Sequence, residues 1–318
     1  MNNKVIPIFF AINDSYSPYL SVALTSAIKN SSPENNYRAI ILHDGVSEEN
    51  KAKLSALATD NFKIDFIAME KGLESITDVR GNRLRCEYFT LTIYFRLFIP
   101  AMFPEYDKAI YLDGDIVVQG DIAELYNIDL GDNVIGACQD HSCNGIEPFQ
   151  RYFELHAGVD RNKYVNSGVL LMDLKKLREA DFDKHFLELL NAYHFDSVCP
   201  DQDYINAICC DRIYHLPATW DRMPNNANPY DPTSKLIHYN LFAKPWCYDD
   251  IQYGDIFWEY AKQSVYYPVL KAEKDGFDDE KKAEDNKTLD LMLNRAIEIS
   301  HGEKTFKKVF ESGVKVRL

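Results

Sequence analysis

Short apolar runs alternate with amphipathic stretches along the first seventy residues of the chain. Three of these runs have the length of a strand and cover Val5–Ile12, 37–43 and 63–68. A helix is predicted after the first run, where Ser17 is expected to cap a helix with Pro18 at its first position. A second helix is predicted after Ser47, with Glu48 and Glu49 in its first turn. This βαβαβ order predicts an open parallel sheet.

The same alternation continues through the rest of the chain. Further strands are predicted at 109–112, 133–138 and 167–172, and helices at 181–194 and 201–210. From residue 266 the sequence becomes charge-mixed and poor in glycine, and Leu289, Met292, Leu293 and Ile297 recur at helical spacing. We therefore expect an α/β domain over residues 1–265 and a helical C-terminal appendage over residues 266–318.

The composition predicts a globular protein that does not bind nucleic acid. Of the 318 residues, 46% are hydrophobic, which is enough for a large core. The chain has 35 Lys and Arg against 49 Asp and Glu, so its formal net charge is -14. Such a surface repels phosphate backbones unless a local basic patch reverses the field.

The cysteines and the first apolar run indicate a cytoplasmic protein. The cysteines are odd in number and form no Cys-x-x-Cys pair, which argues against a disulfide framework or a zinc ribbon. The run at Val5–Ile12 is too short to cross a bilayer and lacks a small-residue cleavage site. We expect buried thiols at Cys86, Cys138, Cys143, Cys199, Cys209, Cys210 and Cys247.

The strongest candidate for chemistry is Asp113-Gly114-Asp115, directly after the predicted strand at 109–112. Ligand sites in open α/β sheets lie at the carboxyl ends of strands, and two carboxylates there suit Mg²⁺ or Mn²⁺. Two other interpretations stay open. An Asp-Gly pair also forms tight turns. The motif also fits a haloacid-dehalogenase-type phosphatase, with Asp113 as the nucleophile and Asp115 as acid and base.

Several separate motifs together resemble glycosyltransferase family 8, the group that contains bacterial lipooligosaccharide galactosyltransferases and glycogenin. The resemblance spans residues 4–265 and implies the Rossmann-like nucleotide-binding fold called GT-A. In chain order the motifs are residues 10–16 (FAINDSY), 94–96 (YFR), 113–115 (DGD), 166–171 (NSGVLL), 201–203 (DQD), 238–239 (HY) and 244–246 (KPW).

The resemblance implies that Asp113, Asp115 and His238 bind a divalent metal, which bridges the diphosphate of a UDP-sugar. An imidazole beside two carboxylates suits Mn²⁺ better than Mg²⁺, so Mn²⁺ is expected and Mg²⁺ is the alternative. Lys244 is expected to contact a phosphate as a point charge.

The rest of the implied donor site lies mainly in the loop after the first strand. It includes Ala11, Asn13 and Tyr16 near the base, and Gly114 between the two carboxylates. The bacterial galactosyltransferases have aspartate where this chain has Asn13 and asparagine where it has Ser15. Leu241 occupies a position that is commonly glycine, close to the diphosphate. Contacts to the nucleotide are therefore expected to differ in part, and ordinary turn chemistry is the alternative for these loop residues.

Other residues resemble those that surround the transferred sugar. Arg96 is expected to reach the sugar hydroxyls or a nearby carboxylate, because an unpaired buried charge is costly, and a structural ion pair is the alternative. Asn166, Asp201 and Gln202 are expected to line the hexose and its anomeric carbon. Capping of a helix is the alternative for Asp201.

The implied activity is transfer of a hexose from UDP-glucose or UDP-galactose, with retention, to a glycan or lipid-linked glycan acceptor, as in bacterial lipopolysaccharide biosynthesis. Retention by double displacement needs a good nucleophile, and the amide of Gln202 is a poor one, so same-face attack is expected. The phosphatase, a sugar-nucleotide-binding protein without catalysis, and self-glycosylation on one of the 20 tyrosines remain alternatives.

The C-terminal segment 301–318 combines basic and apolar residues. A segment of this kind can hold a protein peripherally at the anionic inner face of a membrane. Packing of its apolar side chains on the core is the alternative. The basic residues are Lys304, Lys307, Lys308, Lys315 and Arg317, and the apolar ones are Phe306, Val309, Phe310, Val314 and Val316.

Overall fold

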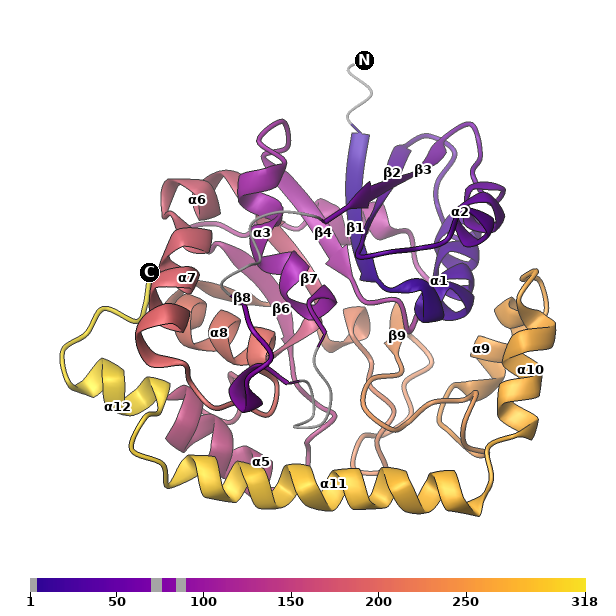
Figure 1. The fold of residues 1–318 in the computed structure, drawn as a ribbon. Helices are drawn as coiled ribbons and strands as arrows, with labels where there is room; N and C mark the ends of the chain where they lie inside the picture. Colours follow the sequence, from indigo (N-terminus) through magenta and orange to yellow (C-terminus); the bar gives the residue numbers. More distant parts are fainter. Residues whose placement is uncertain (1–4, 70–75, 84–89) are drawn as a thin grey trace.

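The computed structural model describes residues 5–69, 76–83 and 90–318, and its centre is a seven-stranded sheet (Figure 1). The strand order is β3-β2-β1-β4-β7-β6-β8. All six strands predicted from the apolar runs are confirmed. They are β1 (Val5–Ile12), β2 (Asn36–His43), β3 (Phe62–Ala68), β4 (Lys108–Leu112), β6 (Ile135–Gln139) and β7 (Val165–Asp173). The seventh strand, β8 (Ile213–His215), was not predicted.

The sequence predicted a parallel sheet, but the observed sheet is mixed. β1 pairs in parallel with β2 and β4, but β7 runs antiparallel to both β4 and β6. A strand buried on both faces is a continuous apolar run in either direction, so its sequence carries no sign of this reversal. As a consequence, the start of β7 lies beside the end of β4. This arrangement brings two of the sequence motifs together at one edge.

The predicted helices form, with one error at a helix start. α2 (Glu48–Ser55) is capped by Ser47 as predicted, since its hydroxyl accepts a hydrogen bond from the Asn50 backbone N–H. Ser17 is not a cap, because it is already the first residue of α1 (Ser17–Lys29). A single 3₁₀ turn comes before that helix and is capped by the side chain of Asn13. The other predicted helices are α7 (Phe182–Tyr193) and α8 (Pro200–Cys209).

A second, two-stranded sheet and several short helices were not predicted. β5 (Ile116–Val118) and β9 (Leu236–His238) pair antiparallel, and the pairing sets Ile116 opposite His238. Three residues are too few to show a period, so these strands escape pattern analysis. The remaining helices of this region are α3 (Phe95–Met102), α4 (Ile122–Tyr126), α5 (Glu147–Tyr152), α6 (Leu174–Glu179) and α9 (Gly254–Ala261).

Successive residues of the central strands enter different cores. Phe9 and Tyr111 belong to one cluster of buried side chains, while their neighbours Ile8 and Ile110 belong to another. This alternation places one core on each face of the sheet. The polar residues that follow the strands are therefore held on a rigid base.

The C-terminal helices are α10 (Tyr267–Asp275), α11 (Asp279–Ser300) and α12 (Phe306–Glu311). α11 runs along one side of the molecule and packs on α5, and the C-terminus ends beside α7 (Figure 1). Phe306 is buried and stacks on Phe195 with ring centroids 3.8 Å apart. Val309 and Val316 are also buried. These contacts support packing of the segment on the core, and the domain boundary at residue 265 stays a prediction.

The structure bears on two sequence predictions, one about membrane spans and one about the cysteines. Within residues 5–69, 76–83 and 90–318, no helix is long and apolar enough to span a bilayer. The described cysteines, from Cys138 to Cys247, are all free thiols. Cys86 lies outside the described residues.

We predict that His156 makes the stability of the fold depend on pH. The imidazole lies between Tyr152 and Phe306, neither ring nitrogen has a hydrogen-bond partner among the described residues, and burial lowers its pKa from 6.5 to about 3. Between those values only the unfolded state binds the proton, so this group's contribution is complete above pH 6.5 and is lost as the pH falls towards 3. Relative to His156→Phe, the wild type should lose up to about 1.4 kcal/mol per pH unit in this window.

Urea unfolding of both proteins at several pH values measures this difference. Groups other than His156 also titrate in the window, but they are common to both proteins and cancel in the comparison. A constant difference in the free energy of unfolding between pH 7 and pH 4 would contradict the prediction.

Candidate functional site

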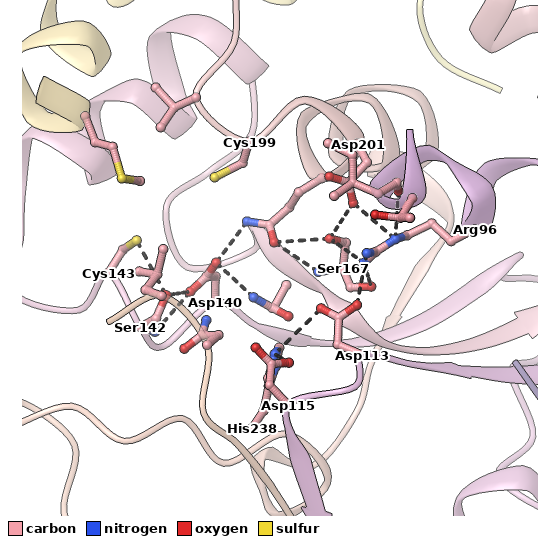
Figure 2. A pocket seen from close by; sticks show the side chains of 18 of the residues that line it. Arg96, Asp113, Asp115, Asp140, Ser142, Cys143, Ser167, Cys199, Asp201 and His238 are labelled. Atoms are coloured by element: carbon pink, nitrogen blue, oxygen red, sulfur yellow. Dashed lines mark hydrogen bonds and ion pairs between the residues drawn. The ribbon is translucent and has the colours of Figure 1, made fainter. Parts of the chain in front are cut away.

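A deep pocket opens where β1 and β4 end and β7 begins. Its walls combine acidic groups from the strand ends, the Arg96 side chain from α3 and the first turn of α8. The close view in Figure 2 shows Asp113, Asp115 and His238 grouped on one side and Arg96, Ser167 and Asp201 grouped on another. Motifs that are far apart in the sequence therefore line one pocket.

Asp113, Asp115 and His238 form a compact set of metal-ligating side chains. One ligand atom from each lies within 4.8 Å of the others. The Nε2 atom of His238 is 3.7 Å from Asp113 Oδ2 and 3.4 Å from Asp115 Oδ1. Asp113 and Asp115 lie between β4 and β5, and the β5–β9 pairing carries His238 to them.

Two further charged groups hold this set in place. Lys244 Nζ donates a hydrogen bond to Asp115 Oδ2, and Nδ1 of His238 is 3.0 Å from Asp221 Oδ1. Burial by itself would raise the pKa of Asp115, but the positive charges of Lys244 and His238 outweigh it and lower that pKa. Burial likewise opposes the charge on His238, but Asp221 and Asp115 raise the pKa of its imidazole to about 10. Asp221 has the partner role that commonly fixes the tautomer of a metal-binding histidine.

Arg96 is buried and joins three elements. Its Nη2 donates to Asp113 Oδ1 at 2.9 Å, and its Nη1 donates to the Ser167 backbone oxygen at 2.6 Å. Its Nε lies 3.3 Å from Asp201 Oδ2. The guanidinium also lies 4.3 Å from the centroid of the Tyr111 ring. The buried charge of Arg96 is therefore paired with two carboxylates, those of Asp113 and Asp201. Arg96 also lines the pocket.

The three residues expected around the sugar form one hydrogen-bond network. Gln202 Oε1 accepts from the Ser167 N–H at 3.0 Å, and Gln202 Nε2 donates to Asp140 Oδ2 at 2.9 Å. Asn166 Nδ2 donates to the same Asp140 oxygen at 3.3 Å. Asp201 accepts from the Ser167 hydroxyl at 2.9 Å. Its carboxylate does not cap α8, whose N-cap position is occupied by Cys199.

Some of the residues predicted to bind the sugar donor line the pocket, and others lie outside its lining. Ala11, Tyr16 and Gly114 line the pocket. Asn13 and Lys244 are not among the described residues that line it. Asn13 Oδ1 accepts from the Tyr16 N–H at 3.2 Å and thereby shapes the turn, which is the alternative stated for the loop residues. Lys244 is buried, and its Nζ donates hydrogen bonds to Asp115 Oδ2 and to the Tyr239 backbone oxygen.

Leu241 has a backbone conformation that favours glycine. Its φ angle is +50°, in the left-handed region that residues with a Cβ rarely adopt. The resemblance placed glycine at this position. In this chain a leucine adopts that conformation, and Leu241 lines the pocket.

Sequence reasoning missed two acidic residues of the site. Asp140 directly follows β6 and is buried, so the signal that identified Asp113, a carboxylate after an apolar strand, was present for it as well. Asp221 follows a single 3₁₀ turn at Ala218–Trp220, where no periodic pattern marks it. It becomes visible only through its contact with His238.

The residues present fit a divalent metal. A Cβ atom added to Gly168 would lie 2.3 Å from Cε1 of His238 and 2.5 Å from Oδ2 of Asp113. The bare glycine backbone therefore lets the histidine and the carboxylate approach each other. The groups linked around the site also include more acids than bases, which favours a bound cation. The acids are Asp113, Asp115, Asp140, Asp201 and Asp221, and the bases are Arg96, Lys244 and His238.

Comparison with known proteins agrees with this arrangement. A protein of Haemophilus influenzae named as a glycosyltransferase is 27% identical over 234 residues, which are 73% of this chain and 66% of that protein. The lipopolysaccharide 1,2-glucosyltransferase of Escherichia coli K12 is 25% identical over 268 residues, covering 77% of this chain and 73% of that protein. The crystal structure of the galactosyltransferase LgtC with donor and acceptor sugar analogues superposes with a TM-score of 0.67 at 27% identity, covering 82% of this chain and 96% of LgtC.

The fold and the pocket at its strand ends thus define a glycosyltransferase of the GT-A class. Within that class, the sequence model of glycosyl transferase family 8 matches residues 7–250, and the chain belongs to this family. The membership decides against the phosphatase interpretation of Asp113. The roles of the individual site residues stay predictions.

We predict that Gly168→Ala weakens Mn²⁺ binding by about 10- to 100-fold, the range typical when groups that orient metal ligands are disturbed. The added Cβ would push His238 and Asp113 apart. Titration with Mn²⁺, followed by the electron paramagnetic resonance of the free ion, measures the affinity. Gly254→Ala is the matched control, because a Cβ there meets only ordinary contacts at 3.5 Å or more. Equal affinity in the two variants would refute the steric argument.

Proposed function

We propose that this protein is a retaining hexosyltransferase that uses UDP-glucose or UDP-galactose and a divalent metal, Mn²⁺ in preference to Mg²⁺. The observation that carries the proposal is the convergence of Asp113, Asp115 and His238 at the pocket, beside the sugar-binding network of Arg96, Asp140 and Gln202. The intact ligand set is also what distinguishes an enzyme from a sugar-nucleotide-binding protein without catalysis.

The donor would lie across the pocket from the turn after β1 to the Asp140 network. Ala11 and Tyr16 are on the wall where the uridine is expected, and Gly114 is next to the metal ligands. Asp113, Asp115 and His238 would hold the metal, which supplies Lewis-acid stabilisation of the leaving diphosphate. Lys244 contributes by fixing Asp115 and by its positive charge, which is expected to attract a phosphate of the donor.

The sugar would meet groups whose positions are fixed before it binds. The Ser167 N–H donates to the amide oxygen of Gln202, and the amide nitrogen of Gln202 donates to Asp140. The amide therefore has a defined orientation. Arg96 holds Asp113 and Asp201 in place from one side. Such preorganised dipoles and charges stabilise a sugar on which positive charge develops without having to reorient during the reaction.

We infer same-face attack for the chemical step. The bond from the anomeric carbon to the phosphate oxygen breaks as the bond to the acceptor oxygen forms, and the acceptor proton passes to the departing diphosphate. Gln202 then positions the sugar and is not a nucleophile, since an amide is a poor one. The Asp201 carboxylate is paired with Arg96 and accepts a hydrogen bond from the Ser167 hydroxyl, and these contacts reduce its availability as a nucleophile.

The proposal includes a glycan or lipid-linked glycan as the acceptor and a cytoplasmic location, as the sequence indicates. The similarity to a lipopolysaccharide 1,2-glucosyltransferase supports an acceptor of this kind. A panel of UDP-sugars assayed for metal-dependent release of UDP tests the donor. If no UDP-sugar is turned over with Mn²⁺ or Mg²⁺, the proposal fails.

We predict that Asp113→Asn or Asp115→Asn lowers metal-dependent release of UDP by at least about 10²-fold, because each change removes a negative charge at the metal. His238→Ala should lower the rate and also raise the Mn²⁺ concentration needed for half-maximal rate. Asp129→Asn is the control, since Asp129 lies in a surface turn where it accepts a bond from Gly131 N–H. Near-normal turnover in either aspartate variant would remove the metal assignment.

We predict that Gln202→Ala keeps measurable activity, because a positioning group is partly replaceable and a covalent nucleophile is not. Initial rates of UDP release give the loss. Intact-mass analysis after incubation with the donor looks for a sugar attached to the protein. A glycosyl adduct on Gln202 or Asp201 would overturn same-face attack, and an adduct on a tyrosine would instead indicate self-glycosylation.

A further inference from the structure

The pocket continues beyond the sugar-binding network into a part of different chemistry. We call this part the apolar lobe and define it by Cys143, Phe149, Phe153, Val198, Cys199 and Met292, all of which line the pocket. In Figure 2 the thiol of Cys143 lies on the far side of Asp140 from Asp113, and the thiol of Cys199 lies above Asp140. Asp140 therefore marks the border between a charged half and an apolar half.

Five separate segments build the apolar lobe. Cys143 comes from the turn between β6 and α5, Phe149 from α5, Phe153 from the π-helical turn that follows it, Val198 and Cys199 from the segment before α8, and Met292 from α11. The side chains of Phe149, Phe153, Val198 and Met292 are buried and belong to one hydrophobic cluster. The lobe is therefore a formed part of the packed interior and not a patch of exposed surface.

The hydroxyl groups of Tyr152 and Ser142, which lie near the apolar lobe, are already engaged. The Tyr152 hydroxyl donates to Asp203 and accepts from the Val198 N–H at 3.0 Å. The Ser142 hydroxyl donates to Asp140. Burial raises the pKa of both thiols, at Cys143 and Cys199, so they remain protonated and behave as small apolar groups.

This lining selects between two kinds of occupant. The hydroxyl groups of a second sugar ring would lose water in the apolar lobe and find few free partners, which is unfavourable. An aryl or alkyl group would instead exchange water for contacts with Phe149, Phe153 and Met292, which is favourable. The charged half of the pocket, with the metal ligands and Arg96, is the part suited to the polar donor.

We propose that the apolar lobe binds the apolar aglycone of a glycoside acceptor, whose sugar lies beside Asp140 next to the transferred hexose. This inference rests on the proposed function for the identity of the reaction, but the binding preference of the lobe is a separate property. The acceptor class is then a glycoside with an aryl or alkyl aglycone, and an acceptor made only of sugar rings binds more weakly.

α11 offers a matched pair of residues for the test. Met292 is 1% exposed and lines the pocket, while its neighbour Leu291 is 39% exposed and does not belong to the hydrophobic cluster of the lobe. Met292→Gln places a polar amide in the lobe, and Leu291→Gln makes a comparable change on the surface of the same helix. Val198→Thr replaces one methyl group by a hydroxyl group of similar size and serves as a second lobe variant.

The experiment measures binding to the full chain with Mn²⁺ and UDP present. Calorimetric titration compares phenyl β-glucoside with methyl β-glucoside, and phenyl β-galactoside with methyl β-galactoside. We expect the phenyl compound of at least one pair to bind about 10-fold more tightly, because the ring removes apolar area from water. Met292→Gln and Val198→Thr should remove most of that preference, and Leu291→Gln should keep it.

The outcomes separate this inference from the proposed function. Equal affinities for phenyl and methyl compounds in both pairs, or a preference that survives in Met292→Gln and Val198→Thr as fully as in Leu291→Gln, would overturn the apolar lobe as an aglycone site. Release of UDP from UDP-glucose and UDP-galactose is measured on the same protein. A phenyl preference without any metal-dependent release of UDP would sustain the lobe and refute the hexosyltransferase.

Discussion

The site depends on one buried guanidinium. Arg96 holds the carboxylate at the end of β4, the backbone at the start of β7 and the carboxylate in the first turn of α8. A buried charge needs such partners, and buried carboxylates in turn need a cation, so the three elements stabilise one another electrostatically. Because the guanidinium is planar and presents several fixed donors, it also sets their relative orientation. Arg96 thus joins the candidate metal site to the hydrogen-bond network of Ser167, Asp201 and Gln202.

The reversed direction of β7 makes this junction geometrically available. An antiparallel β7 sets its first residues beside the end of β4, so that Gly168 O accepts from the Asp113 N–H at 2.8 Å. Asn166 and Ser167 then lie at the same edge as Asp113 and within reach of Gln202 and Asp140. A parallel strand would place these residues at the opposite edge of the sheet. The strand direction therefore determines the chemistry of the pocket as much as the residue types do.

Sequence reasoning found most of the framework and part of the site. Long buried strands and helices have local patterns of apolar, polar and capping residues. The elements β1, α2 and α7 were therefore predictable from their own residues. The direction of β7 and the three-residue strands β5 and β9 depend on pairing partners that are distant in sequence. The same holds for the site. Asp113 and Asp115 carry a strand-end signal, whereas His238, Lys244 and Arg96 entered through resemblance alone, and Asp221 carries no signal before its contact with His238 is seen.

The C-terminal segment has a consequence for synthesis of the protein. Phe306, Val309 and Val316 belong to the same buried cluster as Phe9 and Tyr111, and the Leu318 N–H donates to the Ile208 oxygen at 2.9 Å. The cluster can therefore not be completed while residues 306–316 are still inside the ribosome. Until then the rings of Phe195 and Tyr204, which Phe306 covers, lack that neighbour. A chain that stalls or is clipped before this segment would expose an aromatic surface to chaperones, proteases and other nascent chains.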